Sequence, residues 1–438
     1  MYKFISNISK QDFQLLYSRG FISEKRNILA KLGSLELVFE KFIESESKTE
    51  AIKNAELIEL FDSCSDKNKN IEELTETLKK IAPGNGRIGF HQVNFLIDYL
   101  RKKVWKYLQD KEYSLDLISH DHAFGSGGDF IKTMHATTSA SIIVTPLVTI
   151  CKTGTTNVTS QHGSSQAITE LGYNHIQVNP FYLKELLVRY NFAFVSLADL
   201  GFPYSDKLIE ARKQLWYQNL IEINRKYKPT KENWQEILKR TDISLDIDIF
   251  KIVAPNAQVL NPVHHSTGVC HLGMIPYVLG IYLHLGSKGI IYHCYDGIDE
   301  ISNASVNQEK DIPNNLIIKI DSKSITIAEF SPEDIGLERV NIEEIKAEQE
   351  IKEEMNIFWE ILSGDKQYFK SKRDFLVANA GLLLVAGEKV PNLHEDIVSQ
   401  LKTGVKIAEY LIDSGKSYEN FHQILLALHN NLDWSLSK

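Results

Sequence analysis

The chain has 438 residues, of which 43% are hydrophobic and 24% charged, so it can form a sizeable core and is not an intrinsically disordered protein. Its formal net charge of −8 argues against a nucleic-acid-coating surface, and no apolar run approaches the length of a membrane span. The scattered cysteines indicate neither a disulfide framework nor a structural zinc site, and with no signal-peptide pattern we expect a cytoplasmic protein.

Residues 1 to about 110 are predicted to be helical. Residues 90–105 place apolar side chains at i+3 and i+4 steps among lysines and arginines. Polar or glycine-rich breaks at 44–48, 65–70 and 83–86 separate this helix from those before it. We therefore expect residues 1–112 to form a small all-helical domain.

From about residue 115 the pattern changes to short β-rich runs that alternate with helical stretches. This alternation predicts an α/β domain with a mainly parallel central sheet. The predicted strands cover residues 147–151, 193–197, 289–294, 316–320 and 325–330.

Two further regions complete the predicted organisation. Residues 216–246 are polar and helical in pattern, with a break at 228–230, and are interpreted as a helical insertion. Near the C-terminus, one helix ends at Gly387, and Asn392 with Glu395 forms a capping pattern before a second helix that ends at Gly415. We expect helices from about 180–248 to join the helical domain, and residues 113–180 and 249–438 to form the α/β domain.

Two histidine-containing runs raise the question of a metal site. These are the segment from His120 to His122 and the pair His264 and His265. Neither has a third ligand at a suitable spacing, so we interpret both as loop residues.

The segment 122–129 is the first with chemistry in it. Gly125, Gly127 and Gly128 expose backbone N–H groups without obstruction by a Cβ atom, which suits an anion such as diphosphate. Thr137 and Thr138 follow at a predicted helix start, where hydroxyls and N–H groups also suit phosphate. For a glycine-rich match taken alone, a tight turn without a ligand is the commoner explanation.

Other motifs follow this loop in a fixed order. They are Cys-Lys-Thr-Gly at 151–154, Gln-His-Gly-Ser-Ser at 161–165, Leu-Asn-Pro at 260–262, Tyr-Asp-Gly-Ile-Asp-Glu-Ile-Ser at 295–302 and Ser-Pro-Glu-Asp-Ile-Gly-Leu at 331–337. In this order and spacing the chain resembles the anthranilate phosphoribosyltransferases, and more broadly the superfamily they share with pyrimidine nucleoside phosphorylases. The resemblance covers about residues 115–425; residues 1–110 match loosely, and the insertion departs from the pattern.

The resemblance implies a reaction and a set of partners. Members of that family transfer phosphoribose from phosphoribosyl diphosphate (PRPP) to the nitrogen of an aromatic acceptor, use Mg²⁺, and commonly form homodimers through the helical domain. The departing diphosphate gains negative charge while the ribose becomes oxocarbenium-like, so such a site must stabilise charge. We expect PRPP and a small aromatic acceptor as substrates, and neither nucleic acid nor membrane as partners.

The resemblance also assigns residues to PRPP and metal. The glycines would wrap the diphosphate, Asp129 would lie beside the ribose phosphate end, and Lys152 would supply a point charge. Asp299 and Glu300 match the family's acidic pair for Mg²⁺, and the hydroxyl of Thr137 would face phosphate or metal. The full predicted PRPP-binding set is Gly125, Gly127, Gly128, Asp129, Thr137, Thr138, Lys152, Gly154, Ser164 and Ser165.

Each of these residues also has a plain structural explanation. An adjacent Asp-Glu pair is usually a solvated turn, Lys152 suits the end of any strand, and Thr137 with Thr138 can simply cap a helix. The ordered set of motifs favours the functional interpretation over these single-residue explanations.

The acceptor half of the site departs from the family. Arg212 lies where the family places the arginine that grips the acceptor carboxylate, although a surface helix arginine paired with an acid would look the same. Anthranilate enzymes carry Lys-His-Gly-Asn-Arg where this chain has Lys-Thr-Gly-Thr-Thr at 152–156, and His-Pro where it has Phe-Pro at 202–203. These changes predict an acceptor other than anthranilate. The predicted acceptor-binding set is Arg212, Thr153, Thr155 and Phe202.

His135 stands where the family has an asparagine. It is a candidate phosphate-contacting cation or acid–base group, and inert packing is the commonest role of a lone histidine.

Two other functions remain open from the sequence. One is a nucleoside phosphorylase that uses phosphate and a nucleoside; the Asp299–Glu300 pair argues against it. The other is a catalytically degenerate binding paralogue, which the altered segment 153–156 keeps open.

Overall fold

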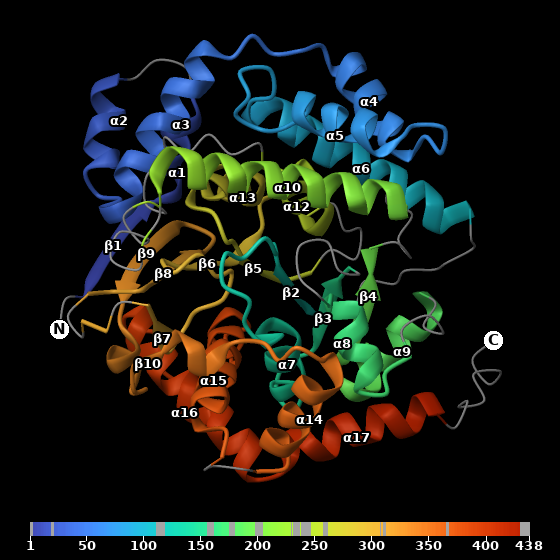
Figure 1. Ribbon diagram of the computed structural model, residues 1–438. Helices are drawn as coiled ribbons and strands as arrows, with labels where there is room; N and C mark the ends of the chain where they lie inside the picture. The colour runs from blue at the N-terminus through green and yellow to red at the C-terminus, as the bar shows by residue number, and fades with distance from the viewer. Residues whose placement is uncertain are drawn as a thin grey trace.

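The computed structural model describes residues 3–18, 22–110, 119–155, 162–174, 180–197, 205–228, 230, 237, 247–256, 262–306, 308–309, 312–364 and 368–429. A central sheet lies between two layers of helices (Figure 1). None of the helices in this described part of the chain combines the length and the apolar character that crossing a bilayer requires.

The central sheet has eight strands in the order β1-β9-β8-β6-β5-β2-β3-β4. Neighbours from β6 through β5, β2 and β3 to β4 are parallel, and β8, β9 and β1 extend the other edge by antiparallel pairing. A small second sheet pairs β7 with β10 in parallel. The strands are β1 (Phe4–Ser9), β2 (Asp121–Gly125), β3 (Ile150–Gly154), β4 (Phe192–Ser196), β5 (His264–Gly268), β6 (Lys288–Cys294), β7 (Ala304–Ser305), β8 (Asn315–Ile320), β9 (Ser324–Phe330) and β10 (Val340–Asn341).

Helices from the N-terminal third share one side of the sheet with three helices from the middle of the chain (Figure 1). They are α1 (Lys10–Gln14), α2 (Ile22–Leu29), α3 (Glu36–Lys48), α4 (Asn54–Asp62), α5 (Ile71–Lys80), α6 (Phe90–Asp110), α10 (Asp206–Tyr227), α12 (Ile249–Asn256) and α13 (Ile275–Leu285).

The opposite side of the sheet carries the remaining helices of the described chain (Figure 1). They are α7 (Ala136–Ile143), α8 (Ser164–Glu170), α9 (Pro180–Tyr190), α14 (Ile351–Leu362), α15 (Lys370–Ala386), α16 (Ile397–Asp413) and α17 (Lys416–His429). Short 3₁₀ turns occur at Leu15–Tyr17, Gly33–Leu35, Ser63–Ser65, Leu272–Met274, Pro332–Ile335 and Ile342–Ile345.

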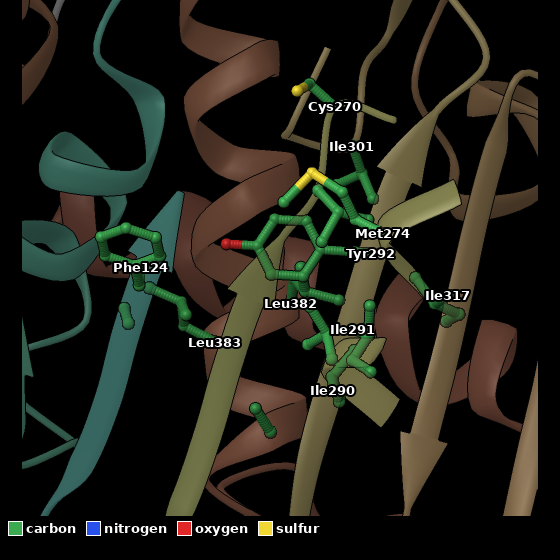
Figure 2. Packing of buried hydrophobic residues seen from close by; sticks show 14 of the residues in the cluster. Phe124, Cys270, Met274, Ile290, Ile291, Tyr292, Ile301, Ile317, Leu382 and Leu383 are labelled. Carbon is green, nitrogen blue, oxygen red and sulfur yellow. The ribbon is translucent and has the colours of Figure 1, made fainter. Parts of the chain in front are cut away.

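The core is continuous across the sheet, and it supports the strand ends from which the site is built. Strands β3, β4 and β5 are buried along their whole length, as parallel strands covered by helices on both faces must be. Figure 2 shows Ile290, Ile291 and Tyr292 of β6 among the buried side chains of this core, together with Leu382 of α15. Because such interiors are close-packed, the strand ends above them are held rigidly.

The predicted fold class is confirmed: the protein is α/β, with a large and mostly parallel central sheet and a helical N-terminal region. The predicted strands 193–197, 289–294, 316–320 and 325–330 correspond to β4, β6, β8 and β9 within one residue at either end. The division of the chain into two domains stays a prediction.

Three expectations about individual elements are wrong. Residues 4–9 are not helical but form β1, because pairing with β9, which lies far away in the sequence, satisfies an extended backbone that no local pattern indicates. The histidine runs are not loops: Asp121 and His122 of β2 pair with His264 and His265 of β5 in the middle of the sheet. The last capped helix begins after Asp396, whose carboxylate accepts from the N–H groups of Val398 and Ser399, and not at Asn392.

The predicted insertion is partly described. Helix α10 runs without interruption through Trp216 to Tyr227, so the helical pattern from residue 216 continues an element that starts earlier. It ends at Lys228, which has a positive φ of 45°, at the break that the sequence predicts. Most of residues 229–246 lie outside the described part of the chain.

Candidate active site

A cavity of about 220 Å³ opens at the carboxyl ends of the parallel strands. Its wall includes Gly125 at the end of β2, Gly154 at the end of β3 and the turn that follows β6, with Asp299 and Glu300. Helices α10 and α12 add Arg212 and Lys251 from the other side. This is the place where open α/β sheets bind their ligands.

The glycine loop after β2 is held close to the turn that follows β6. The backbone N–H of Gly127 donates to Oδ2 of Asp299 at 2.5 Å. A Cβ atom on Gly125 would lie 2.8 Å from the same oxygen, and φ at Gly127 and Gly128 is +62° and +89°. Glycine is therefore required here both for the close approach of the carboxylate and for the backbone conformation.

Three carboxylates meet in the cavity. Asp129, Asp299 and Glu300 each offer an oxygen, and these oxygens lie within 4.8 Å of one another. The backbone N–H of Asp299 donates to Oδ1 of Asp129 at 2.8 Å, and Thr137 Oγ1 donates to Glu300 Oε1 at 3.1 Å. Burial and the charge of Asp299 raise the pKa of Asp129 to about 7, and burial with both aspartates raises the pKa of Glu300 well above its usual range. Hard carboxylate oxygens this close suit a divalent cation such as Mg²⁺, which would offset their mutual repulsion.

Several cations surround this acidic cluster. Burial lowers the pKa of Lys152 to about 8, although the charges of Asp299 and Glu300 oppose that shift. Lys132 Nζ donates to the carbonyl of Asp129 at 2.8 Å, and Lys251 Nζ donates to the carbonyl of Gly127 at 3.1 Å. The cavity thus carries both signs of charge, as an enclosed site for a polyanion and a metal requires.

His135 is the N-cap residue of α7, and it lies in the cavity wall with both ring nitrogens facing acceptors. Nδ1 lies 2.7 Å from Oε1 of Glu354, and Nε2 lies 3.2 Å from the carbonyl of His162. Burial lowers the pKa of His135, but the charge and hydrogen bonds of Glu354 outweigh it, so the net shift is upward. Since neutral imidazole has one N–H, this geometry fits the doubly protonated cation. His135 therefore suits the role of a fixed positive charge better than that of a general base.

Arg212 reaches the cavity but is already paired with an acid. Its Nε donates to Oδ2 of Asp248 at 2.6 Å, and both side chains are buried. Oδ1 of Asp248 accepts from the backbone N–H of Phe250 at 3.0 Å, at the start of α12. An acceptor carboxylate at Arg212 would thus compete with an internal one.

The structure brings most of the predicted site residues to one cavity. Those in its wall are Gly125, Gly127, Asp129, His135, Thr137, Thr138, Lys152, Thr153, Gly154, Thr155, Ser164, Arg212, Asp299 and Glu300. Gly128 and Ser165 are not in the wall as described, and Phe202 lies outside the described residues. The Thr153 hydroxyl lies 2.8 Å from Nε2 of the buried His122, so it is engaged within the sheet.

Four contributors to the site were missed in the sequence. Lys132, Lys251, Trp216 and Glu354 all contact the glycine loop or His135. Lys132 follows Asp129 by three residues, and that proximity was the one local signal available. The other three come from helices distant in the chain, and nothing near them in the sequence marks them.

The family model described as "Glycosyl transferase family, a/b domain" matches residues 242–418. Together with the relatives named below, this match indicates a glycosyltransferase of the pentosyltransferase type.

Within that class the chain is similar to anthranilate phosphoribosyltransferases. It is 27% identical over 325 residues to the anthranilate phosphoribosyltransferase of Thermoanaerobacter sp. (strain X514), covering 73% of this chain and 81% of the relative. It is 26% identical over 377 residues to that of Caldanaerobacter subterraneus subsp. tengcongensis, covering 82% and 94%.

Solved structures show the same fold. The anthranilate phosphoribosyltransferase of Thermus thermophilus aligns with a TM-score of 0.60 at 17% identity, over 89% of this chain and 99% of that one. The Saccharomyces cerevisiae enzyme, in complex with PRPP and Mg, aligns with a TM-score of 0.55 at 18% identity, over 94% and 99%.

Proposed function

We propose that the chain is a Mg²⁺-dependent phosphoribosyltransferase that transfers phosphoribose from PRPP to the nitrogen of an aromatic or heteroaromatic acceptor other than anthranilate. One observation carries the proposal: the 125–129 loop and the carboxylates of Asp299 and Glu300 share one cavity with Lys152. An anion-binding loop beside a cation-binding cluster is what a departing diphosphate requires.

The residues present fit a divalent cation. Asp129, Asp299 and Glu300 supply oxygen donors, and burial together with the charge of Asp299 raises the pKa of Asp129 to about 7, so a cation bound among them would relieve their repulsion. Mg²⁺ bound there would neutralise charge that develops on the diphosphate. The protein's own contribution is positioning: the loop N–H groups and Lys152 hold the diphosphate, and the hydroxyl of Thr137 supports Glu300.

The acceptor side supports a substrate different from anthranilate. Asp248 already accepts from Nε of Arg212, so a bidentate grip on an acceptor carboxylate would have to use the two terminal nitrogens beside an internal carboxylate. Thr153 is turned toward His122, and threonines stand where the resemblance leads us to expect histidine, asparagine and arginine. A site whose polar groups differ selects a different partner, since buried polar groups left unpaired are costly.

The test is an incubation with PRPP, Mg²⁺ and a panel of aromatic amines and acids that includes anthranilate, followed by mass spectrometry. We expect a phosphoribosyl adduct with a member other than anthranilate, together with release of diphosphate. The double variant Asp299→Ala, Glu300→Ala is the matched control, and it should abolish both signals.

Each other outcome changes the proposal in a defined way. If anthranilate is the best acceptor, the acceptor part is wrong. Ribose 1-phosphate formed from a nucleoside and phosphate, without PRPP turnover, indicates a phosphorylase. No heat on calorimetric titration with PRPP, diphosphate or phosphate indicates a binding protein that has lost the reaction.

A homodimer formed through the helical side is part of the proposal. Tyr217 and Ile221 on α10 are 58% and 66% exposed. Large apolar side chains this exposed on one helix suit a face that a second subunit covers. Light scattering on wild type and on Ile221→Asp tests it, since a charge at a buried interface should produce a monomer.

A further inference from the structure

Three consecutive carbonyl groups of the glycine loop each accept a hydrogen bond from a side chain. Lys251 Nζ lies 3.1 Å from the carbonyl oxygen of Gly127, and Trp216 Nε1 lies 3.1 Å from that of Gly128. Lys132 Nζ lies 2.8 Å from the carbonyl oxygen of Asp129 and 5.0 Å from the centre of the Trp216 ring. We call Lys132, Trp216 and Lys251 the loop clamp.

The clamp controls the direction of the loop's amides. In a trans peptide the C=O and the following N–H point in opposite directions, so a donor that fixes one carbonyl also fixes the next N–H. Lys251 thereby orients the N–H of Gly128, and Trp216 orients the N–H of Asp129. Gly127 and Gly128 both have positive φ, and because they lack a Cβ atom the unrestrained loop has more backbone freedom to lose than a loop without glycine.

Two members of the clamp, Trp216 and Lys251, come from α10 and α12, on the side of the sheet that also carries the N-terminal helices (Figure 1). Figure 1 shows α10 and α12 above the ends of β2 and β5, where the glycine loop begins. Lys251 is buried, and a Cβ atom on Gly128 would lie 2.1 Å from its Nζ, so the lysine occupies the space that glycine leaves open. The loop is therefore fixed by side chains that do not belong to its own strand or turn.

The same two helices also hold the acceptor end of the cavity. Trp216 follows Arg212 by one helical turn on α10, and Lys251 follows Asp248 by three residues at the start of α12. The Arg212–Asp248 pair joins the helices to each other, while Trp216 and Lys251 join them to the loop. A shift of this helix pair would therefore move both ends of the site together.

We propose that Trp216 and Lys251 are positioning residues on α10 and α12 that preorganise the diphosphate loop. They thereby couple the loop to the acceptor end of the cavity. This inference rests on the proposed function, because it assigns PRPP to the loop. A loop that is ordered beforehand binds its ligand without first losing conformational entropy.

The test variant is Trp216→Phe, which removes the indole N–H but keeps an aromatic ring and adds no charge. One hydrogen bond contributes about 1 kcal/mol net, so its loss is expected to weaken PRPP binding about fivefold. We expect KM for PRPP to rise by that factor while kcat changes less than twofold, with the thermal midpoint of the free protein unchanged. Trp359→Phe is the matched control, since Trp359 packs on Tyr418 and Phe421 of α17.

A second pair of variants separates the hydrogen bond from general packing. Lys251→Met keeps the apolar stem and removes the donor, whereas Lys251→Arg keeps a donor and the charge. We expect Lys251→Met to raise the calorimetric Kd for Mg²⁺–PRPP at least fivefold and Lys251→Arg to restore most of the affinity.

The outcomes separate this inference from the proposed function. If wild type does not bind Mg²⁺–PRPP, the proposed function fails before the clamp is tested. If wild type binds and both Trp216→Phe and Lys251→Met bind equally well, the clamp is refuted and the proposed function stands. The clamp would also be refuted if these variants lowered both kcat and the thermal midpoint while KM for PRPP stayed unchanged. That result would indicate that the residues have only a structural role.

Discussion

Replacing Asp299 by alanine is expected to change the affinity for diphosphate in opposite directions with and without Mg²⁺. In the structure the N–H of Gly127 donates to Oδ2 of Asp299 at 2.5 Å, so a carboxylate oxygen occupies the position that our proposal gives to a diphosphate oxygen. Without metal, an incoming diphosphate must displace this carboxylate and lie beside its charge. The variant removes both obstacles.

The magnitude follows from the hydrogen bond. A hydrogen bond to a charged group contributes about 1.5–3 kcal/mol, so metal-free diphosphate should bind about 10- to 150-fold more tightly to Asp299→Ala. With saturating Mg²⁺ the order reverses, because the variant has lost one of the three carboxylates that lie within 4.8 Å.

Isothermal titration calorimetry with diphosphate, in EDTA and in excess MgCl₂, measures both affinities. Asp299→Asn keeps an oxygen acceptor without the charge and shows how much of the effect is electrostatic. Asp321→Ala, in the exposed turn between β8 and β9, is a matched control that should leave both titrations unchanged. Weaker or unchanged metal-free binding by Asp299→Ala would refute the reasoning.

Three further predictions concern charge, packing and capping. Because burial lowers the pKa of Lys152 to about 8, its positive charge is present below pH 8 and is lost above it. The affinity for PRPP, measured by calorimetry, should therefore fall as the pH rises through 8. Lys152→Met should bind PRPP weakly, and its affinity should not change over this pH range. Gly404→Ala places a Cβ atom 2.5 Å from the carbonyl oxygen of Gly381, where α15 crosses α16. This variant should lower the free energy of unfolding, measured in urea, by about 1–3 kcal/mol. Gly273→Ala is the control and should not lower it, because the space around Gly273 is open. Burial raises the pKa of Asp396, but Lys3 and Ser399 outweigh burial and bring the pKa down to about 2. The stabilisation that the carboxylate gives the folded state is therefore present above the unfolded-state pKa of 3.8 and is lost as the pH falls toward 2. In urea unfolding at each pH, Asp396→Ala should cost about 1 kcal/mol at pH 7 and nothing below pH 2.

Much of the site was predictable because its signals are local. The glycines at 125, 127 and 128 follow from the backbone freedom that an anion-binding turn needs, and Asp299 with Glu300 are neighbours in the chain. Strands β6, β8 and β9 are rich in β-branched, aromatic and other apolar residues, so their own composition indicated them.

Other features depended on partners far away in the sequence. Strand β1 exists because residues 4–9 find residues 324–329 at the edge of the sheet. The histidines of β2 and β5 are tolerated in central strands since they meet each other and neighbouring side chains there, with the rings of His122 and His265 5.5 Å apart. No periodicity within either segment reports such a contact.

The sequence by itself determined the α/β class, the order of the motifs, and the glycines and carboxylates at the strand ends, because backbone freedom and hydrophobic pattern are properties of short segments. Only the tertiary structure decided that Asp299 lies on the amide of Gly127, that Asp248 pairs with Arg212, and that Trp216 and Lys251 hold the loop. Those contacts join segments between 36 and 172 residues apart, and their energy depends on distances that folding alone creates.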